Sequence, residues 1–411
     1  MKRKRRAAQA LLLVLSLLCS VLPVGTAAGA GVIRWPKNAE VISEEMFYGN
    51  AEIEQAIIPE GVRRIESKAF ADSFLREITL PDSLEFIADD AFLRSSLRIV
   101  HAKKGTYGYN WMREKGYLVE YRALLIGEKN FLSGEAADRN VGDVNAMQKM
   151  LQRVYGPTGL QYSVNKKTNL KYDQIEAQIQ STFADTMEQD VSLFFIATHG
   201  NEKNDGDLEM AFTGDPENEE DTESFVRWLP FDTLASWLSS YVQGKVIVLL
   251  ESCGAGSAIY AGNNATGMLF AGKSAPLDGG EAFVERAVRA FAKADPGLPD
   301  VSEPSGAKGN GTGAMRQPKF YVLAAADHGE KSWGYANGTV GYPVMNLFTI
   351  WLLDGIGKAG ASPADLFPQD GILTLRELFE YINTNGKHNG ETIQHVQCYP
   401  QDSGFECFVL K

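Results

Sequence analysis

The chain has 411 residues, a length that predicts two or three domains rather than one. Hydrophobic residues make up 44% and charged residues 22% of it, a composition typical of globular proteins that excludes an intrinsically disordered chain. The formal net charge is −12 and no basic stripe occurs beyond the N-terminus, so we expect no nucleic-acid partner.

The N-terminal segment 1–30 has the three-part pattern of a secretory signal peptide. The residues from Lys2 to Arg6 are all cationic, Leu11 to Leu22 form an apolar run, and Ala28-Gly29-Ala30 fits a cleavage site made of small residues. The apolar run is short for a membrane span. The pattern therefore predicts export, and an uncleaved membrane anchor is the alternative.

Cysteines are few after this segment. Cys253, Cys398 and Cys407 remain, and an odd number gives no disulfide framework. Cys398 and Cys407 either pair across a turn or stay as buried thiols, and both readings remain open. Cys253 is left as a free thiol in an exported protein, so it is a candidate for reactivity.

A repeat occupies the next segment. Ile58-Pro59-Glu60-Gly61-Val62 recurs as Leu80-Pro81-Asp82-Ser83-Leu84, and Ala69-Phe70 recurs as Ala91-Phe92, each 22 residues later. Such a period with fixed apolar positions is typical of a leucine-rich-repeat solenoid. It resembles the leucine-rich repeats of bacterial surface proteins. We expect a short module over residues 38–118 with two to three units, which is either a docking surface for a surface partner or a structural cap.

From residue 120 the pattern changes to alternating strands and helices, which predicts an α/β domain with a largely parallel sheet covered on both faces. The expected strands are 122–127, 160–164, 191–197, 245–251 and 319–325. The expected helices are 140–155, 172–187, 231–241 and 281–293.

The two clearest strands end in residues that carry chemistry. The strand over 191–197 runs into Thr198-His199-Gly200, and the strand over 245–251 runs into Ser252-Cys253-Gly254. Ligands bind beyond the carboxyl ends of strands in open α/β sheets, so both side chains are expected at one rim. An imidazole takes the proton of a thiol or stabilises the thiolate. We predict His199 and Cys253 as a catalytic dyad, with the backbone N–H groups of Gly200 and Cys253 as oxyanion donors.

This arrangement resembles the caspase-like cysteine peptidases, which include caspases, metacaspases, legumain, gingipain and clostripain. Further stretches of residues 120–411 agree with it: Glu251 to Ser257, Asp143 to Gln148, Leu229 to Asp232, Ala324 to Trp333, Gly371 to Tyr381 and the Gln397-Cys-Tyr-Pro400 turn. The resemblance implies a caspase-like sheet flanked by helices. It also implies peptide-bond hydrolysis through a Cys253 thioester, with His199 as general acid and base and with no cofactor.

The resemblance leaves the cleavage preference open between Arg or Lys and Asn or Asp. We expect Arg or Lys, with Asp143, Asp327 and Glu330 as candidates for binding the substrate cation. For Asp327 and Glu330 the alternative is an ordinary solvated loop.

Two insertions carry further expectations. The acidic stretch 215–223 is a hairpin tip or, as in some relatives, a calcium site. The stretch 295–318, rich in Gly, Pro and Ser, is a flexible loop or a self-processing segment with Lys308 and Arg316 as cleavage sites.

The predicted protein is therefore a secreted or cell-surface bacterial cysteine endopeptidase acting on a protein or peptide. Two alternatives remain. One is a surface binding protein with leucine-rich repeats and an inactive caspase-like domain. The other is an Asn- or Asp-specific peptidase or transpeptidase of the legumain type.

Overall fold

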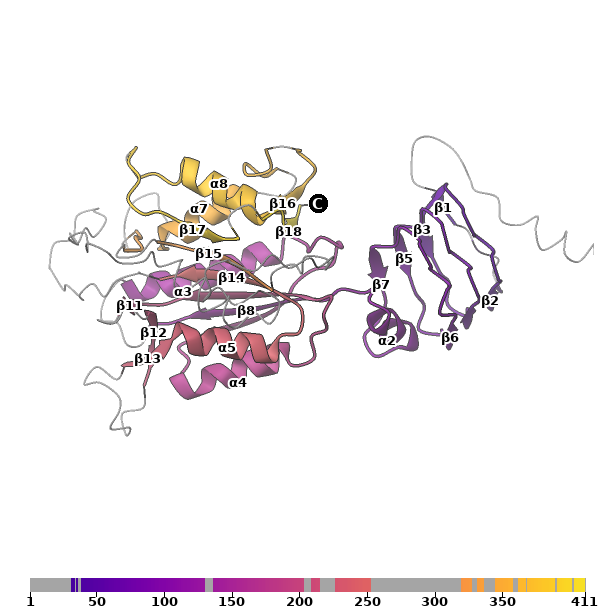
Figure 1. The fold of residues 1–411 in the computed structure, drawn as a ribbon, viewed down its shortest axis with the longest axis horizontal. Helices are drawn as coiled ribbons and strands as arrows, with labels where there is room; N and C mark the ends of the chain where they lie inside the picture. Colours follow the sequence, from indigo (N-terminus) through magenta and orange to yellow (C-terminus); the bar gives the residue numbers. More distant parts are fainter. Residues whose placement is uncertain are drawn as a thin grey trace, which may run out of the picture. The chain divides into compact units, whose positions relative to one another are not determined.

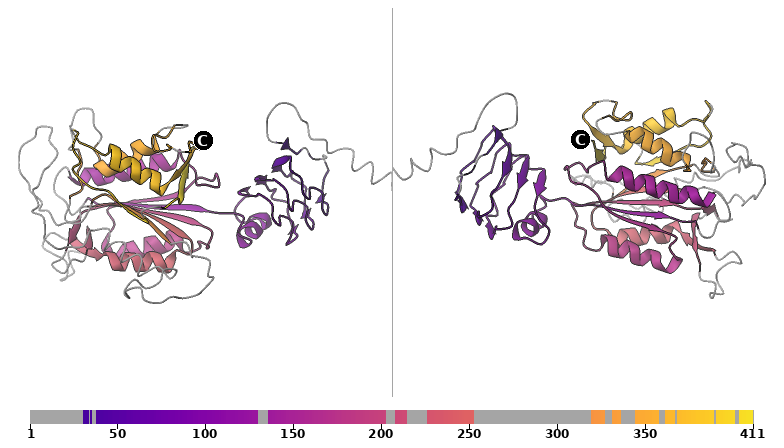
Figure 2. Two further views of the ribbon diagram at one scale, coloured as in Figure 1. Left: turned by 45° about the horizontal axis from the view of Figure 1, so that its top comes forward. Right: turned by 180° about the vertical axis from the view of Figure 1, so that it is seen from behind.

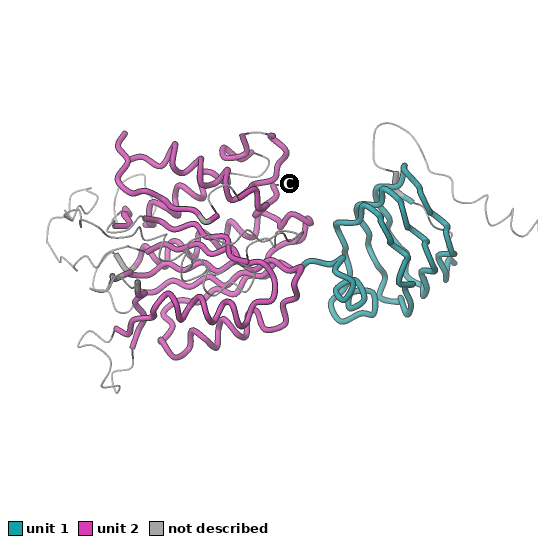
Figure 3. The backbone as a smooth tube through the Cα atoms, viewed as in Figure 1, with its two compact units in different colours: residues 1–119 teal, residues 120–411 magenta. Residues whose placement is uncertain are grey.

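The computed structural model describes residues 31–33, 35, 38–129, 136–202, 208–214, 226–252, 319–326, 331–335, 344–357, 361–366, 368–388, 390–400 and 403–410. The chain divides into two compact units, Met1–Val119 and Glu120–Lys411 (Figure 3). Each unit is described by itself. The predicted signal segment 1–30 lies outside the described residues.

The first unit is a solenoid of short parallel strands (Figure 1). One sheet contains β1 (Gly31–Val32), β3 (Ile53–Ile57), β5 (Glu77–Thr79) and β7 (Ile99–His101). The other contains β2 (Val41–Ile42), β4 (Arg64–Ile65) and β6 (Phe86–Ile87), and the helix α2 (Tyr107–Glu114) follows. The predicted start of the repeats at residue 38 is too late, because β1 already pairs with β3.

The repeat period places equivalent side chains on top of one another in the core of this unit. Phe70 stacks on Phe47 at 5.2 Å and on Phe92 at 5.4 Å between ring centroids. All three rings are buried. Offset aromatic stacks of this kind stabilise beyond the area that they bury, so the phenylalanine ladder holds successive repeats in register.

The second unit is built on a six-stranded sheet in the order β17-β15-β14-β10-β8-β9. The strands are β8 (Tyr121–Gly127), β9 (Ser163–Thr168), β10 (Val191–Ala197), β14 (Lys245–Glu251), β15 (Phe320–Ala324) and β17 (Gln397–Tyr399). All neighbours are parallel except β17, which is antiparallel to β15. Every residue of β8 and β10 is buried, as expected for inner strands of a parallel sheet.

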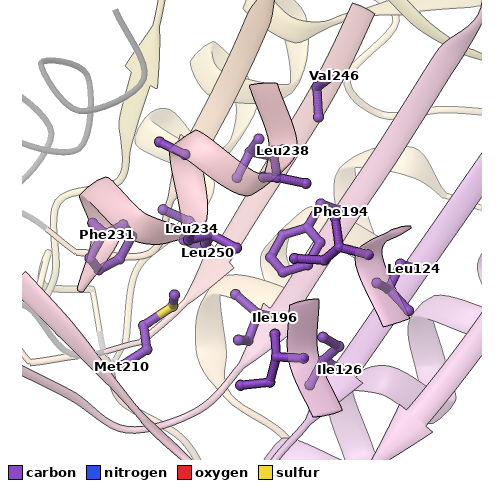
Figure 4. Close-up of a cluster of buried hydrophobic side chains, with 14 of the residues drawn as sticks. Leu124, Ile126, Phe194, Ile196, Met210, Phe231, Leu234, Leu238, Val246 and Leu250 are labelled. Carbon is purple, nitrogen blue, oxygen red and sulfur yellow. The ribbon is translucent and has the colours of Figure 1, made fainter. Parts of the chain in front are cut away.

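Helices cover both faces of this sheet (Figures 1 and 2). One face carries α4 (Tyr172–Phe183) and α5 (Phe231–Tyr241), and the other carries α3 (Ala136–Leu151), α7 (Leu347–Ile356) and α8 (Leu375–Asn385). Side chains from the sheet, α4 and α5 form one apolar core. Figure 4 shows the part of it between the sheet and α5. This is the α/β architecture that the sequence predicts.

Two small antiparallel sheets complete the described part of the unit. The first is formed by β11 (Gly200–Glu202), β12 (Leu208–Thr213) and β13 (Val226–Pro230), which follow β10 directly. The second pairs β16 (Ile372–Thr374) with β18 (Glu406–Val409). Within the ranges described above, no helix has the length and apolar character needed to cross a bilayer.

The predictions for strands 191–197 and 245–251 and for helix 231–241 are confirmed. The prediction of a strand over 160–164 is wrong, because the strand is the polar edge segment Ser163–Thr168 rather than the apolar residues before it. The helix α7 was not predicted, since it is apolar on nearly every position and has no amphipathic stripe. The predicted turn at Gln397-Cys-Tyr-Pro400 contains the edge strand β17. The expected helix 281–293 lies outside the described residues.

Candidate active site

The pairing of β10 with β14 positions the ends of the two strands that carry the predicted dyad. Ala197 is the register partner of Glu251, and the N–H of Thr198 donates to the carbonyl of Glu251 at 3.1 Å. His199 is two residues beyond Ala197, and Cys253 is two residues beyond Glu251. The two strands are parallel, so both predicted residues follow strands that leave the sheet at the same edge. Cys253 itself lies outside the described residues.

The backbone around His199 is fixed by the strand β12. The N–H of Ala211 donates to the carbonyl of His199 at 2.8 Å, and the hydroxyl of Thr198 donates to the carbonyl of Ala211 at 2.6 Å. Gly200 is buried, begins β11 and pairs with Met210. Burial lowers the pKa of His199 below its ordinary value of 6.5, which favours the neutral imidazole that a general base requires.

Asp143 lies in α3 and is completely buried. One carboxylate oxygen accepts the backbone N–H of Asn346 at 2.9 Å, and the other accepts its side-chain amide at 2.5 Å. The described partners of Asp143 therefore hold α3 against the start of α7. The sequence predicts that Asp143 binds the substrate cation. Here its carboxylate is completely buried, and its two oxygens accept hydrogen bonds from Asn346.

Glu251, the last residue of β14, is a second buried carboxylate at the same edge. One of its oxygens accepts both the N–H and the hydroxyl of Thr349, at 2.9 and 2.8 Å. The other oxygen accepts the hydroxyl of Ser332 at 2.5 Å. Glu251 therefore connects the strand that leads to Cys253 with the helix α7 and with the chain after β15.

Asp143 and Glu251 influence each other electrostatically. Burial raises the pKa of both carboxyls, and the charge of Glu251 raises the pKa of Asp143 further. The guanidinium of Arg139 acts in the opposite direction on both groups, and its Nε donates to the side-chain oxygen of Asn346 at 3.1 Å. Because both pKa values are raised, protonation of one carboxyl is favoured, and the remaining carboxylate is then balanced by Arg139.

The segment 327–330, which contains Asp327 and Glu330, lies outside the described residues, but its two flanks are held. The amide of Gln394 donates to the carbonyl of Ala325 at 2.8 Å and accepts the N–H of Trp333 at 2.9 Å. Gln394 is buried. The same side chain thus joins the two ends of this segment beside Glu251.

No separate role for Glu251 is predicted from the sequence, although one signal is present: an acidic residue ends the otherwise apolar run from Val246 to Leu250. Thr349 and Asn346 had no such signal, since they come from the unpredicted helix α7 and its N-cap. The stretches 215–223 and 295–318, with Lys308 and Arg316, lie outside the described residues. In the part of the chain that is described, no group of three His, Cys, Asp or Glu side chains is arranged to hold a metal ion.

The two cysteines near the C-terminus are both buried and are not joined by a disulfide. The Sγ atoms of Cys398 and Cys407 contact the carbonyls of Pro400 and Phe405 respectively. Burial raises the pKa of the Cys407 thiol, which disfavours the reactive thiolate.

The two family models that match the chain agree with its division into two units. Residues 31–107 match the model of the BspA type leucine rich repeat region in six copies, which is more than the two to three units that the sequence predicts. A crystal structure of a Geobacter sulfurreducens protein is similar at 14% identity and a TM-score of 0.38, over 68% of this chain and 92% of that one. No curated protein matches the chain. Residues 120–361 match the caspase domain model, and because this match spans more than half of the sequence, the chain belongs to the caspase-like superfamily of cysteine peptidases.

Proposed function

We propose that this protein is an exported cysteine endopeptidase in which Cys253 is the nucleophile and His199 the general acid and base. The observation that carries the proposal is the register of β10 and β14, in which the partners Ala197 and Glu251 each precede one member of the dyad by two residues. Export is supported by the signal-like segment 1–30 and by the bacterial-type repeats that follow it.

In the proposed reaction the neutral imidazole of His199 takes the proton of the Cys253 thiol, and the thiolate attacks the peptide carbonyl. The backbone N–H groups of Gly200 and Cys253 stabilise the oxyanion of the tetrahedral intermediate. His199 then donates its proton to the leaving amine as the C–N bond breaks. Water hydrolyses the resulting thioester, which releases the acid and restores the thiol.

We further propose a preference for Arg or Lys before the cleaved bond. The support is the pair of buried acids, Asp143 and Glu251, next to the strand that leads to Cys253, where burial raises the pKa of both carboxyls. Burying a cationic side chain is costly unless a carboxylate neutralises it, and a substrate cation beside these acids would favour their ionised form, so the pair favours a basic residue over a neutral one. Asp327 and Glu330 stay candidates for the same role, since both follow β15 in the sequence.

Covalent labelling tests the catalytic proposal. A peptidyl acyloxymethyl ketone with Lys at the reactive position should label the full chain at one cysteine. Cys253→Ala should abolish the label and His199→Asn should slow it strongly, while Cys407→Ala, which removes a buried thiol, serves as the matched control. Labelling that persists in Cys253→Ala, or labelling that is indifferent to His199, would refute the dyad.

Profiling with a positional-scanning peptide library tests the preference separately. We expect cleavage after Arg or Lys, and we expect Glu251→Gln to lower kcat/KM for these substrates more than for substrates with Asn. Cleavage after Asn or Asp would overturn the basic preference and favour the legumain-type alternative. An added amine nucleophile in the same assay reveals transpeptidation by the mass of the product.

A second candidate function is supported by the six repeat copies in residues 31–107, which are more than the two to three units predicted for this module. In this alternative the repeats bind a surface partner and the caspase-like unit is inactive. Absence of both labelling and peptide cleavage in a folded preparation of the full chain would favour it.

A further inference from the structure

In the sheet formed by β11, β12 and β13, the residue Ala211 hydrogen-bonds to the backbone or side chain of both residues that follow β10. Its N–H donates to His199 and its carbonyl accepts the hydroxyl of Thr198, so both residues after β10 depend on it. Its register partner on the next strand is Trp228. The strand β13 is therefore connected through β12 to the backbone of the proposed base.

Trp228 also contacts His199 directly. The indole and imidazole centroids are 6.4 Å apart, and the ring planes are tilted by 45°. Trp228 packs with Ala211 and Val226 in a small apolar cluster that is separate from the main core of the unit. The indole is half-buried, so one part of it packs next to the imidazole and another part is exposed to solvent.

The charges on the neighbouring elements do not account for the state of the imidazole. The ionisable side chains that the structure describes on the neighbouring elements include Glu209 on β12, Arg227 on β13, Glu251 on β14 and Glu128 after β8. The guanidinium of Arg227 lies over the ring of Tyr172 at 4.1 Å. The lowered pKa of His199 has burial as its cause. Burial by neighbouring apolar groups therefore lowers the pKa of His199.

We propose that Trp228 is a positioning residue for His199, whose indole restricts water at the imidazole, holds the ring in place and keeps it neutral for the transfer of the thiol proton. The catalytic meaning of this role rests on the proposed peptidase function. The effect of the Trp228 indole on the protonation of His199 does not depend on that function.

Two measurements on the full chain test the proposal. The first is an NMR titration of His199, identified by the signal lost in His199→Asn, in a Cys253→Ala background with Trp228 replaced by Phe, Leu or Ala. We expect the His199 pKa to rise toward its ordinary value as the cover shrinks from Phe to Leu to Ala. Trp237→Ala removes a partly buried indole that packs on the main core instead and should leave the titration unchanged.

The second measurement is the pH dependence of kcat/KM with Cys253 intact. We expect the acid limb of Trp228→Ala to move to higher pH, with a loss of about threefold or more at pH 6 that is mostly recovered at pH 8. Trp228→Phe, which keeps an aromatic ring next to the imidazole, should have a pH profile close to that of the parent protein. An unchanged His199 pKa in Trp228→Ala would overturn the proposal, and if this variant fails to fold, an unchanged pKa in Trp228→Leu has the same consequence. The titration decides the matter even if the chain cleaves no peptide.

Discussion

The carboxylate of Glu251 accepts both the N–H and the hydroxyl of Thr349, so the end of β14 is bound to the first turn of α7. An anion at a helix N-terminus is stabilised by the unpaired N–H groups and by the helix dipole. Here the anion lies two residues before Cys253 in the sequence. The end of the strand that leads to the proposed nucleophile is therefore linked to a helix almost a hundred residues further along the chain.

The hydroxyl of Thr349 is expected to be essential to this link. Thr349→Val keeps the shape but removes one of three hydrogen bonds to a buried carboxylate, so the free energy of unfolding should fall by about 1–3 kcal/mol. Chemical denaturation, with hydrogen exchange in β10 and β14 to report on this unit alone, measures the change. Thr349→Ser retains the hydroxyl and should lose much less. A larger loss in Thr349→Ser than in Thr349→Val would show that packing of the methyl group, which valine keeps, matters rather than the hydrogen bond.

Glu128 should make stability depend on pH. Its carboxyl is buried, one oxygen accepts the N–H of Leu170 at 2.8 Å, and the other has no hydrogen-bond partner. Burial raises its pKa from 4.5 to about 8, so the folded protein holds an extra proton between these values. The stabilisation that the protonated Glu128 provides is therefore fully present below pH 4.5 and is lost as the pH rises toward 8. The free energy of unfolding falls by up to about 1.4 kcal/mol per pH unit in this range.

Glu128→Gln removes this titration and should be more stable than the parent at pH 8, with the two converging near pH 4.5. Hydrogen exchange of amides in β8 and β10 across this range provides the comparison. Glu188→Gln, at an exposed position, is the control and should leave the slope unchanged. A parent protein and Glu128→Gln with parallel pH profiles would contradict the raised pKa.

The thiols of Cys398 and Cys407 should resist alkylation while the protein is folded. Both are buried, and the raised pKa of Cys407 keeps that thiol protonated at neutral pH. In Cys253→Ala, iodoacetamide should modify neither residue under native conditions and both after denaturation. Mass spectrometry of the peptides detects the modification. A cross-linked peptide pair that resists alkylation in denaturant would show instead that the two thiols are oxidised in the exported protein.

The phenylalanine ladder should control the stability of the repeats. Phe70→Ala removes the middle ring of the stack and leaves a cavity, which costs about 3–5 kcal/mol for a buried phenylalanine. Phe74→Ala, with a side chain 55% exposed in the same unit, is the matched control and should be nearly neutral. Hydrogen exchange should show faster opening of β3 and β5 in Phe70→Ala alone. The same protection in both variants would mean that the stack is not what holds the repeats together.

The sequence alone determined the parts of this protein whose signals are local. A period of 22 residues identified the repeats, and continuous apolar runs identified β10 and β14, because inner strands of a parallel sheet are buried on both faces. His199 and Cys253 follow from the residues that end those runs. The polar edge strand β9 and the uniformly apolar helix α7 have no such pattern, and the sequence therefore placed one wrongly and missed the other.

Only the tertiary structure decided which side chains meet at the edge of the sheet. Asp143 on α3 and Glu251 on β14 are separated by more than a hundred residues, yet their charges interact and both are bound by residues at the start of α7. Trp228 reaches His199 through the register of two strands, which depends on hydrogen bonds between distant backbone segments. Burial and contacts between distant side chains exist only in the folded protein. The protonation states of these residues therefore depend on the tertiary structure and cannot be read from the sequence alone.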